Sequence, residues 1–249
     1  MQVEVFYGTA GVTPADVAGR VVAVIDVLRA SSTIAAALHN GARTVVPLES
    51  SDEAISRSKA LERSEVVLAG ERKMLPIPGF DLGNSPGQFT TAAVEGKTVL
   101  LTTTNGTPAL AGATQGARDV VVASYVNFSA VLSMLRAALR GGTDIAIICA
   151  GRDKQFALED AGCAGRFVRQ VSRRLMHVQM NDAAVASVLI DRRYGENILR
   201  LLSVSAHGKA LRDAGFGDDL AACAALDTYP VIPVYQDRQV TKLGPNRER

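Results

Sequence analysis

The sequence VVAVIDVLRASST, residues 21–33, decides the fold class of this protein. Its first five residues are apolar, and a short apolar run that ends at a polar residue is typical of a strand buried on both faces of a sheet. Ser31, Ser32 and Thr33 favour a helix N-terminus, so we expect a helix to follow them over residues 34–38. A buried strand that leads through a short loop into a helix is the basic unit of an α/β protein.

The same order of elements recurs further along the chain. Residues 19–22 resemble residues 96–99, and residues 41–46 resemble residues 116–121, at offsets of 77 and 75 residues. Two matches at nearly the same offset predict an internal duplication of strand, polar loop, helix and strand. The predicted division has a first α/β half, a second half with a helical C-terminal part, and a polar tail, over residues 1–95, 96–235 and 236–249.

Further elements follow from the same hydrophobic patterns. Residues 229–235 contain Pro230 and Pro233, and proline cannot donate a hydrogen bond within a sheet, so we expect an edge strand or an extended segment there. We expect the tail from Gln236 to be loose at its end. The remaining expected elements are strands at 44–46, 65–69 and 144–149, helices at 51–63 and 127–140, and a mostly helical chain over 158–223.

An irregular segment, residues 70–89, interrupts the pattern with four glycines and three prolines. A long irregular segment inside a compact domain is usually functional or disordered. Because its prolines stiffen it, we expect an ordered binding loop. Its polar residues include Glu71, Arg72, Asp81 and Asn84.

The composition narrows the class of partner. The chain has 249 residues, 27 basic and 25 acidic, for a net charge of +2, which is too balanced to indicate a nucleic-acid or membrane partner. Its three cysteines include no Cys-x-x-Cys pair, which argues against a disulfide framework or a structural zinc site. No apolar run reaches the roughly 18 to 20 residues that span a bilayer. Because no signal peptide is recognisable either, we expect a cytoplasmic protein.

Polar residues follow three of the expected strands, at residues 26–33, 102–108 and 150–153. Ligands of open α/β sheets bind beyond the carboxyl ends of the strands, and a helix N-terminus attracts anions. Such residues usually serve only as helix caps or turns. Their equivalent positions in two repeats favour an anion site, with Arg29 and Arg152 as candidate anion clamps.

Acidic residues supply the second half of a candidate site. Asp26 follows a buried strand, where an unpaired carboxylate is costly, so it needs a cation or hydrogen-bond donors nearby. Glu71 lies in the irregular loop, and Glu159 and Asp160 lie near a helix start, where acids often serve only the helix dipole. Together these carboxylates are able to hold Mg2+. Their spacing does not show which of them do so.

Other kinds of site have less support. The chain has no Gly-x-Gly-x-x-Gly, Walker A or Gly-x-Ser-x-Gly sequence. His39, His177 and His207 fall in expected helices, away from the strand-end loops, so we expect structural roles for them. We expect Cys163 to be a packing residue rather than a nucleophile.

Five short segments occur in one order along the chain, namely VIDVLRASST at 24–33, AGER at 69–72, GNSP at 83–86, TTTNGT at 102–107 and LEDAGCAG at 158–165. In order and spacing, up to about residue 235, they resemble the 2-phosphosulfolactate phosphatase family. The resemblance implies a three-layer α/β/α fold with an active-site cleft between two related halves. It also implies a Mg2+-dependent phosphatase that converts 2-phosphosulfolactate into sulfolactate, a step towards coenzyme M, although members also occur where coenzyme M is not expected.

The expected partner is a small anionic phosphorylated substrate, and a homodimer is left open. We expect attack by water rather than by Asp26, because the paired Asp-x-Asp of haloacid-dehalogenase-type phosphatases is absent. The rivals are a non-catalytic anion-binding protein of the same fold and an enzyme of another class, such as a lyase. The expected catalytic residues are Asp26, Glu71, Glu159 and Asp160, with Asp26, Glu159 and Asp160 as metal ligands. The expected substrate-binding residues are Arg29, Ser31, Ser32, Arg72, Asn84, Ser85, Thr103, Thr104, Asn105, Gly106, Gly151 and Arg152.

Overall fold

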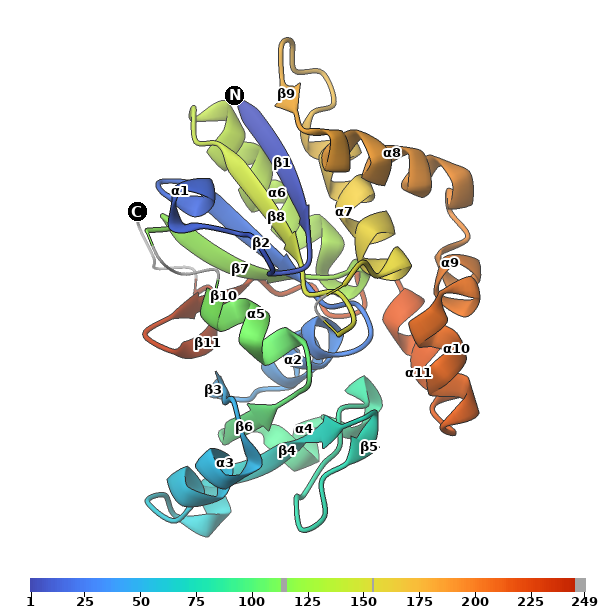
Figure 1. Ribbon diagram of the computed structural model, residues 1–249. Helices are drawn as coiled ribbons and strands as arrows, with labels where there is room; N and C mark the ends of the chain where they lie inside the picture. Colours follow the sequence, from blue (N-terminus) through green and yellow to red (C-terminus); the bar gives the residue numbers. More distant parts are fainter. Residues whose placement is uncertain (113–115, 154, 245–249) are drawn as a thin grey trace.

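The computed structural model describes residues 1–112, 116–153 and 155–244, and its strands form one continuous sheet (Figure 1). The strands are β1 (Gln2–Tyr7), β2 (Val21–Ile25), β3 (Thr44–Pro47), β4 (Val66–Arg72), β5 (Leu75–Pro76), β6 (Thr98–Thr102), β7 (Asp119–Ala123), β8 (Ile145–Cys149), β9 (Gln179–Met180), β10 (Pro233–Gln236) and β11 (Gln239–Lys242). The helices are α1 (Pro14–Val17), α2 (Ala30–His39), α3 (Ser51–Ser58), α4 (Thr91–Val94), α5 (Gly106–Gly112), α6 (Phe128–Arg140), α7 (Leu158–Val171), α8 (Asp182–Tyr194), α9 (Ile198–Val204), α10 (Ala206–Asp213) and α11 (Gly217–Ala224). Three 3-10 turns are η1 (Arg63–Glu65), η2 (Pro86–Gln88) and η3 (Tyr125–Asn127).

The sheet consists of two parallel blocks joined by an antiparallel hairpin, and β5 pairs antiparallel with β4 at one edge. Its strand order is β5-β4-β6-β3-β11-β10-β7-β2-β8-β1-β9. Strands β4, β6 and β3 run parallel in one block, and β7, β2, β8, β1 and β9 run parallel in the other. The hairpin of β10 and β11 pairs antiparallel with β7 on one side and with β3 on the other.

Helices cover both faces of this sheet, because side chains of the central strands alternate between two cores. Ala23 and Ile25 of β2 face a core formed with α6 and α7. Val22 and Val24 face a second core formed with α2 and α5. The fold is therefore the expected three-layer α/β/α arrangement.

The two predicted repeats pair reciprocally in the sheet. One is β2-α2-β3 and the other is β6-α5-β7. The first strand of each pairs parallel with the second strand of the other, β2 with β7 and β6 with β3. Strands from residues 1–95 and from residues 96–235 consequently interleave in one sheet. The arrangement also brings the loops after β2 and β6 to face each other.

Several local expectations differ from the structure. Strand β10 lies inside the sheet rather than at its edge, because Pro233 occupies its first position and only Val234 and Tyr235 pair with β7. The tail after Gln236 contributes β11 to the sheet, and its end, residues 245–249, which we expected to be loose, lies outside the described residues. Helix α2 begins at Ala30, before the serines that were expected to precede it. His177 lies in a bend rather than in a helix.

Candidate active site

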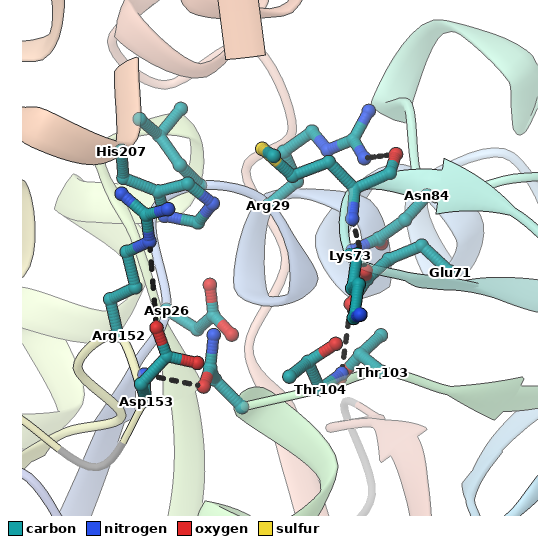
Figure 2. Close-up of a pocket in the computed structure, with 13 residues that line it drawn as sticks. Asp26, Arg29, Glu71, Lys73, Asn84, Thr103, Thr104, Arg152, Asp153 and His207 are labelled. Atoms are coloured by element: carbon teal, nitrogen blue, oxygen red, sulfur yellow. Dashed lines mark hydrogen bonds and ion pairs between the residues drawn. The ribbon is translucent and has the colours of Figure 1, made fainter. Parts of the chain in front are cut away.

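Four separate polar segments meet in one pocket of about 340 Å³, which lies beyond the carboxyl ends of β2, β4, β6 and β8 (Figure 2). They are the segments expected from the sequence, around residues 26–29, 71–84, 103–105 and 152–153. A fifth contribution, His207, comes from helix α10. The lining residues are Asp26, Leu28, Arg29, Glu71, Lys73, Met74, Asn84, Thr103, Thr104, Asn105, Arg152, Asp153 and His207.

Asp26 lies at the floor of the pocket, directly after β2, and is only 6% exposed. Gly106 begins the facing helix α5, where a Cβ atom would lie 2.7 Å from Asp26 Oδ2 and 2.5 Å from the Ala30 Cβ. Glycine is therefore required there for the two strand-end loops to approach this closely. Burial raises the pKa of Asp26 to about 6, an effect that His207 opposes and that Glu71 and Glu159 reinforce.

Asp160 joins two of the strand-end loops and does not line the pocket. Its Oδ1 accepts a hydrogen bond of 2.9 Å from the Val27 amide, and its Oδ2 accepts one of 3.1 Å from the Gly151 amide. Burial raises the pKa of this carboxyl well above its usual range, with Glu159 and Asp26 adding to the shift and the two amides opposing it. We infer that Asp160 holds the loops after β2 and β8 in position.

Glu71 similarly ties the irregular loop to the loop after β6. Its Oε1 accepts a hydrogen bond of 2.8 Å from the Thr104 amide, and its Oε2 accepts one of 2.8 Å from the Met74 amide. The Glu71 side chain lines the pocket, yet both its carboxylate oxygens already accept hydrogen bonds from backbone amides. Asn105, in the same loop, accepts a hydrogen bond of 3.1 Å from the Asp153 amide.

Glu159 pairs with a histidine for which the sequence indicated a structural role. The Glu159 Oε1 lies 3.2 Å from the His207 Nδ1, and Glu159 itself is 1% exposed. Because Nδ1 faces Glu159, the other ring nitrogen, Nε2, is the one left for the pocket. His207 follows Glu159 by 48 residues, and no local motif connects the two.

Arg29 lines the pocket, but its guanidinium already binds other protein groups. Its Nη1 donates to Asp219 at 2.6 Å, its Nη2 donates to the Met74 carbonyl at 2.8 Å, and its guanidinium stacks 4.5 Å above the Phe216 ring. The side chain is 2% exposed. Arg29 therefore fastens helix α11 to the irregular loop, and its charge is balanced by a buried carboxylate.

Other expected binding residues lie outside the pocket lining. Arg72 donates to the carbonyls of Glu71 and Glu49 and to the Thr102 hydroxyl. The remaining ones support neighbouring backbone or side chains: Ser31 accepts from the Asp26 amide, Ser32 donates to the Val27 carbonyl, Ser85 donates to Asp219, and Gly151 donates to Asp160 at a φ of 71°.

Oxygen donors for a metal ion line the pocket, but those of Glu71 and the Asn105 Oδ1 already accept hydrogen bonds from backbone amides. No group of three or more His, Cys, Asp or Glu side chains among the described residues is arranged to hold a metal, so the expected set of Asp26, Glu159 and Asp160 does not form one. Asn84, 4% exposed, presents a buried side-chain Oδ1 for which the described residues provide no hydrogen-bond partner. A buried acceptor in a pocket calls for a partner such as an ion or an ordered water. Asp26 and Asn84 are therefore the donors that fit Mg2+, which needs only one or two carboxylates and keeps several waters.

Two cations stand at the rim of the pocket. Lys73 comes from the β4–β5 turn at a φ of 50°, and Arg152 comes from the loop after β8. Among the described residues, Arg152 makes one ion pair, a long one of 3.8 Å with Asp153, whose side chain is 76% exposed. Figure 2 shows Lys73 and Arg152 on opposite sides of the pocket, with Asp26 between them in this view.

Sequence reasoning missed some of the lining residues. Lys73 and Met74 lie inside the segment expected to be a binding loop, and Asp153 adjoins Arg152, so position in the chain was the available signal. For His207, the sequence contained no signal that it would line the pocket. Cys163 is a packing residue as expected: it is fully buried, and burial raises the pKa of its thiol well above the usual range, which disfavours the nucleophilic thiolate.

No helix among the described residues is long and apolar enough to cross a membrane.

Comparisons with known proteins agree with the motifs. A family model described as 2-phosphosulpholactate phosphatase matches residues 9–238. A probable 2-phosphosulfolactate phosphatase of Symbiobacterium thermophilum is 43% identical over 92% of this chain and 96% of its own length. Proteins with the same description are 32% identical in Clostridium botulinum, over 98% of this chain and 100% of their own length, and 36% identical in Thermotoga petrophila, over 86% and 88%.

Proposed function

This chain belongs to the 2-phosphosulfolactate phosphatase family, and from that premise we propose that it hydrolyses 2-phosphosulfolactate to sulfolactate and inorganic phosphate with the help of Mg2+. The enzyme is a phosphoric monoester hydrolase. A cytoplasmic location and a homodimer remain predictions from the sequence.

One observation supports the assignment of the pocket as the active site. Segments from four distant parts of the chain place a buried carboxylate, Asp26, opposite the loop of residues 103–105 in a single pocket. Phosphoryl transfer requires little covalent chemistry from a protein, and it depends mainly on position and on charge stabilisation. A fixed acid, hydroxyl and amide groups and nearby cations are the groups that this chemistry uses.

Asp26 and Asn84 would hold Mg2+, because Asp26 is a buried carboxylate in the pocket lining and Asn84 carries a buried amide oxygen without a partner among the described residues. When bound, Mg2+ supplies positive charge beside the phosphoryl oxygens and makes a neighbouring water a better nucleophile. The raised pKa of Asp26 agrees with this role, since a buried carboxylate without a cation is costly to ionise.

The loop after β6 would stabilise the transferring phosphoryl group. Thr103 and Thr104 line the pocket with Asn105. The Asn105 Oδ1 is occupied by the Asp153 amide, which leaves the Nδ2 donors of the same side chain for an oxyanion.

His207 would protonate the leaving group. The oxygen released from a hydroxy acid is a strongly basic alkoxide, so protonation as the P–O bond breaks lowers the barrier. Glu159 fixes the ring through Nδ1, and Nε2 is the atom that would deliver the proton. Asp26 would keep the metal ion in the pocket while water attacks the phosphorus atom, and the ester and one water together give the alcohol and phosphate.

Phosphate release from 2-phosphosulfolactate, measured with and without Mg2+, tests the proposal. We expect turnover with Mg2+ and none after full chelation. Turnover that survives chelation would remove the metal from the mechanism. Calorimetry on the same samples separates a non-catalytic binding protein, which would bind the ester without releasing phosphate. Release of a product other than sulfolactate and phosphate would favour a lyase.

A further inference from the structure

The cations around the pocket are not equivalent, and this difference suggests how the substrate is recognised. Arg29 is paired with Asp219 at 2.6 Å and stacked on Phe216, so its charge is already neutralised and its side chain is fixed. Arg72 turns its guanidinium towards Glu49, Glu71 and Thr102, outside the pocket lining. Of the three expected substrate-binding arginines, Arg29 and Arg72 are therefore already engaged by the protein.

Lys73 and Arg152 are differently placed. Lys73 makes no ion pair with any described residue and is exposed at the tip of the β4–β5 turn, although it lines the pocket. The Arg152 side chain is 37% exposed, and its partner Asp153 is 3.8 Å away and largely in solvent. An ion pair of that length and exposure contributes little, so both cations keep most of their capacity to bind an anion.

Their positions match the shape of the proposed substrate. The phosphate of 2-phosphosulfolactate is attached to the central carbon, and the carboxylate and the sulfonate lie on two different arms. With the phosphate over Asp26, the two arms extend towards opposite walls, where Figure 2 shows Lys73 and Arg152.

Resting on the proposed function, we propose that Arg152 binds the carboxylate arm of the substrate and Lys73 binds the sulfonate arm. The guanidinium of Arg152 has the planar, forked donors that match a carboxylate. The ammonium of Lys73 is a compact charge with three rotatable donors, and it suits the three equivalent oxygens of a sulfonate. The two residues thus determine specificity, and they act in binding rather than in the chemical step.

A truncated substrate series tests this assignment. The kinetics of the wild type, Lys73→Met and Arg152→Gln are measured on four esters. The first is 2-phosphosulfolactate, and the second, 2-phospholactate, lacks the sulfonate. The third, 2-phosphooxyethanesulfonate, lacks the carboxylate, and the fourth, isopropyl phosphate, lacks both. Lys73→Met should raise KM about 10-fold for the two sulfonates only, and Arg152→Gln about 10-fold for the two carboxylates only, with kcat nearly unchanged. Lys59→Met and Arg140→Gln, both on exposed helix ends, are matched controls that should change nothing.

The outcomes are distinguishable. A KM increase of equal size on all four substrates would show that the cation acts on the phosphate or on folding, and would overturn the assignment. A reversed pattern, with Lys73→Met affecting the carboxylates, would overturn it as well. If the wild type hydrolyses none of the four esters, the proposed phosphatase function itself fails. Hydrolysis of all four by the wild type at one and the same KM would reject arm recognition and leave the phosphatase function in place.

Discussion

The floor and the rim of the pocket differ in how their charges are supported. The floor consists of Asp26 and Glu71 with Glu159 and Asp160 behind them, all of them 7% exposed or less. Their oxygens accept hydrogen bonds from backbone amides or lie beside His207, and the Asp26 carboxylate also lines the pocket. The rim consists of Lys73 and Arg152, which are solvated and have few protein partners. The contrast agrees with the proposed roles, in which the floor positions the chemical step and the rim recognises the substrate.

The largest effect is expected from Asp26→Asn at the floor. Loss of the carboxylate should lower kcat for 2-phosphosulfolactate by a factor of about 10³ to 10⁴, because the negative charge proposed to bind the metal is removed. The protein should remain folded by circular dichroism. Asp52→Asn, on the exposed first turn of α3, is the matched control. Turnover within a few-fold of the wild type would place the chemistry elsewhere.

His207→Gln should give the next largest effect, and one that depends on the leaving group. Loss of the proton donor should slow hydrolysis of alkyl phosphates by a factor of about 10² to 10³. Hydrolysis of 4-nitrophenyl phosphate should change little, because its leaving group needs no proton. His177→Gln, at an exposed position, serves as the control. Equal slowing on both kinds of ester would contradict a proton-transfer role.

The metal-free protein should lose stability as the pH rises from about 4 to 6. Burial raises the folded-state pKa of Asp26 to about 6, so in this window the folded protein keeps a proton that the unfolded chain has released. The folded state then binds more protons, and the free energy of unfolding falls with pH by about 2 to 3 kcal/mol.

Urea unfolding in the presence of a chelator measures this slope. Asp26→Asn should show a shallower slope, because Asp160, whose pKa burial also raises, still contributes to it, and Mg2+ should reduce the slope in the wild type by favouring the ionised Asp26 carboxylate. An unchanged slope in Asp26→Asn would assign the titration to another group.

The smallest effect is expected from Gly106→Ala, which tests how closely the two loops of the floor are packed. The added methyl would clash with Asp26 and Ala30, so activity should fall about 10-fold through displacement of the carboxylate. Gly87→Ala, in η2, meets no atom within 4 Å and should behave as the wild type. A fully active Gly106→Ala enzyme would show that the floor tolerates movement.

Much of the fold was predictable because its signals are local. The apolar runs of β2, β6 and β8 and the periodic pattern of α6 identify buried strands and an amphipathic helix directly. Strand β10 was wrongly predicted to lie at a sheet edge. A proline excludes a strand from the sheet interior only if its nitrogen faces a paired strand, and this depends on pairing with β7, over 100 residues away. The segments of the site were predictable for the same local reason, since polar residues follow strands.

The roles within those segments were not predictable, because they depend on which atoms become buried together. In the sequence, Asp160 has the position of an acid that serves a helix N-terminus. In the structure, it accepts hydrogen bonds from the loops after β2 and β8. From the sequence, Arg29 was expected to bind an anion. In the structure, its positive charge is neutralised by Asp219, 190 residues further along the chain.

The sequence by itself determined the α/β class, the family and the four segments that form the pocket, because hydrophobic periodicity and short motifs are properties of neighbouring residues. Only the tertiary structure decided that His207 joins Glu159, that Asn84 keeps an unpaired oxygen, and that Lys73 and Arg152 remain available. Hydrogen bonding and charge neutralisation act between atoms within a few ångströms, and folding alone brings those atoms together.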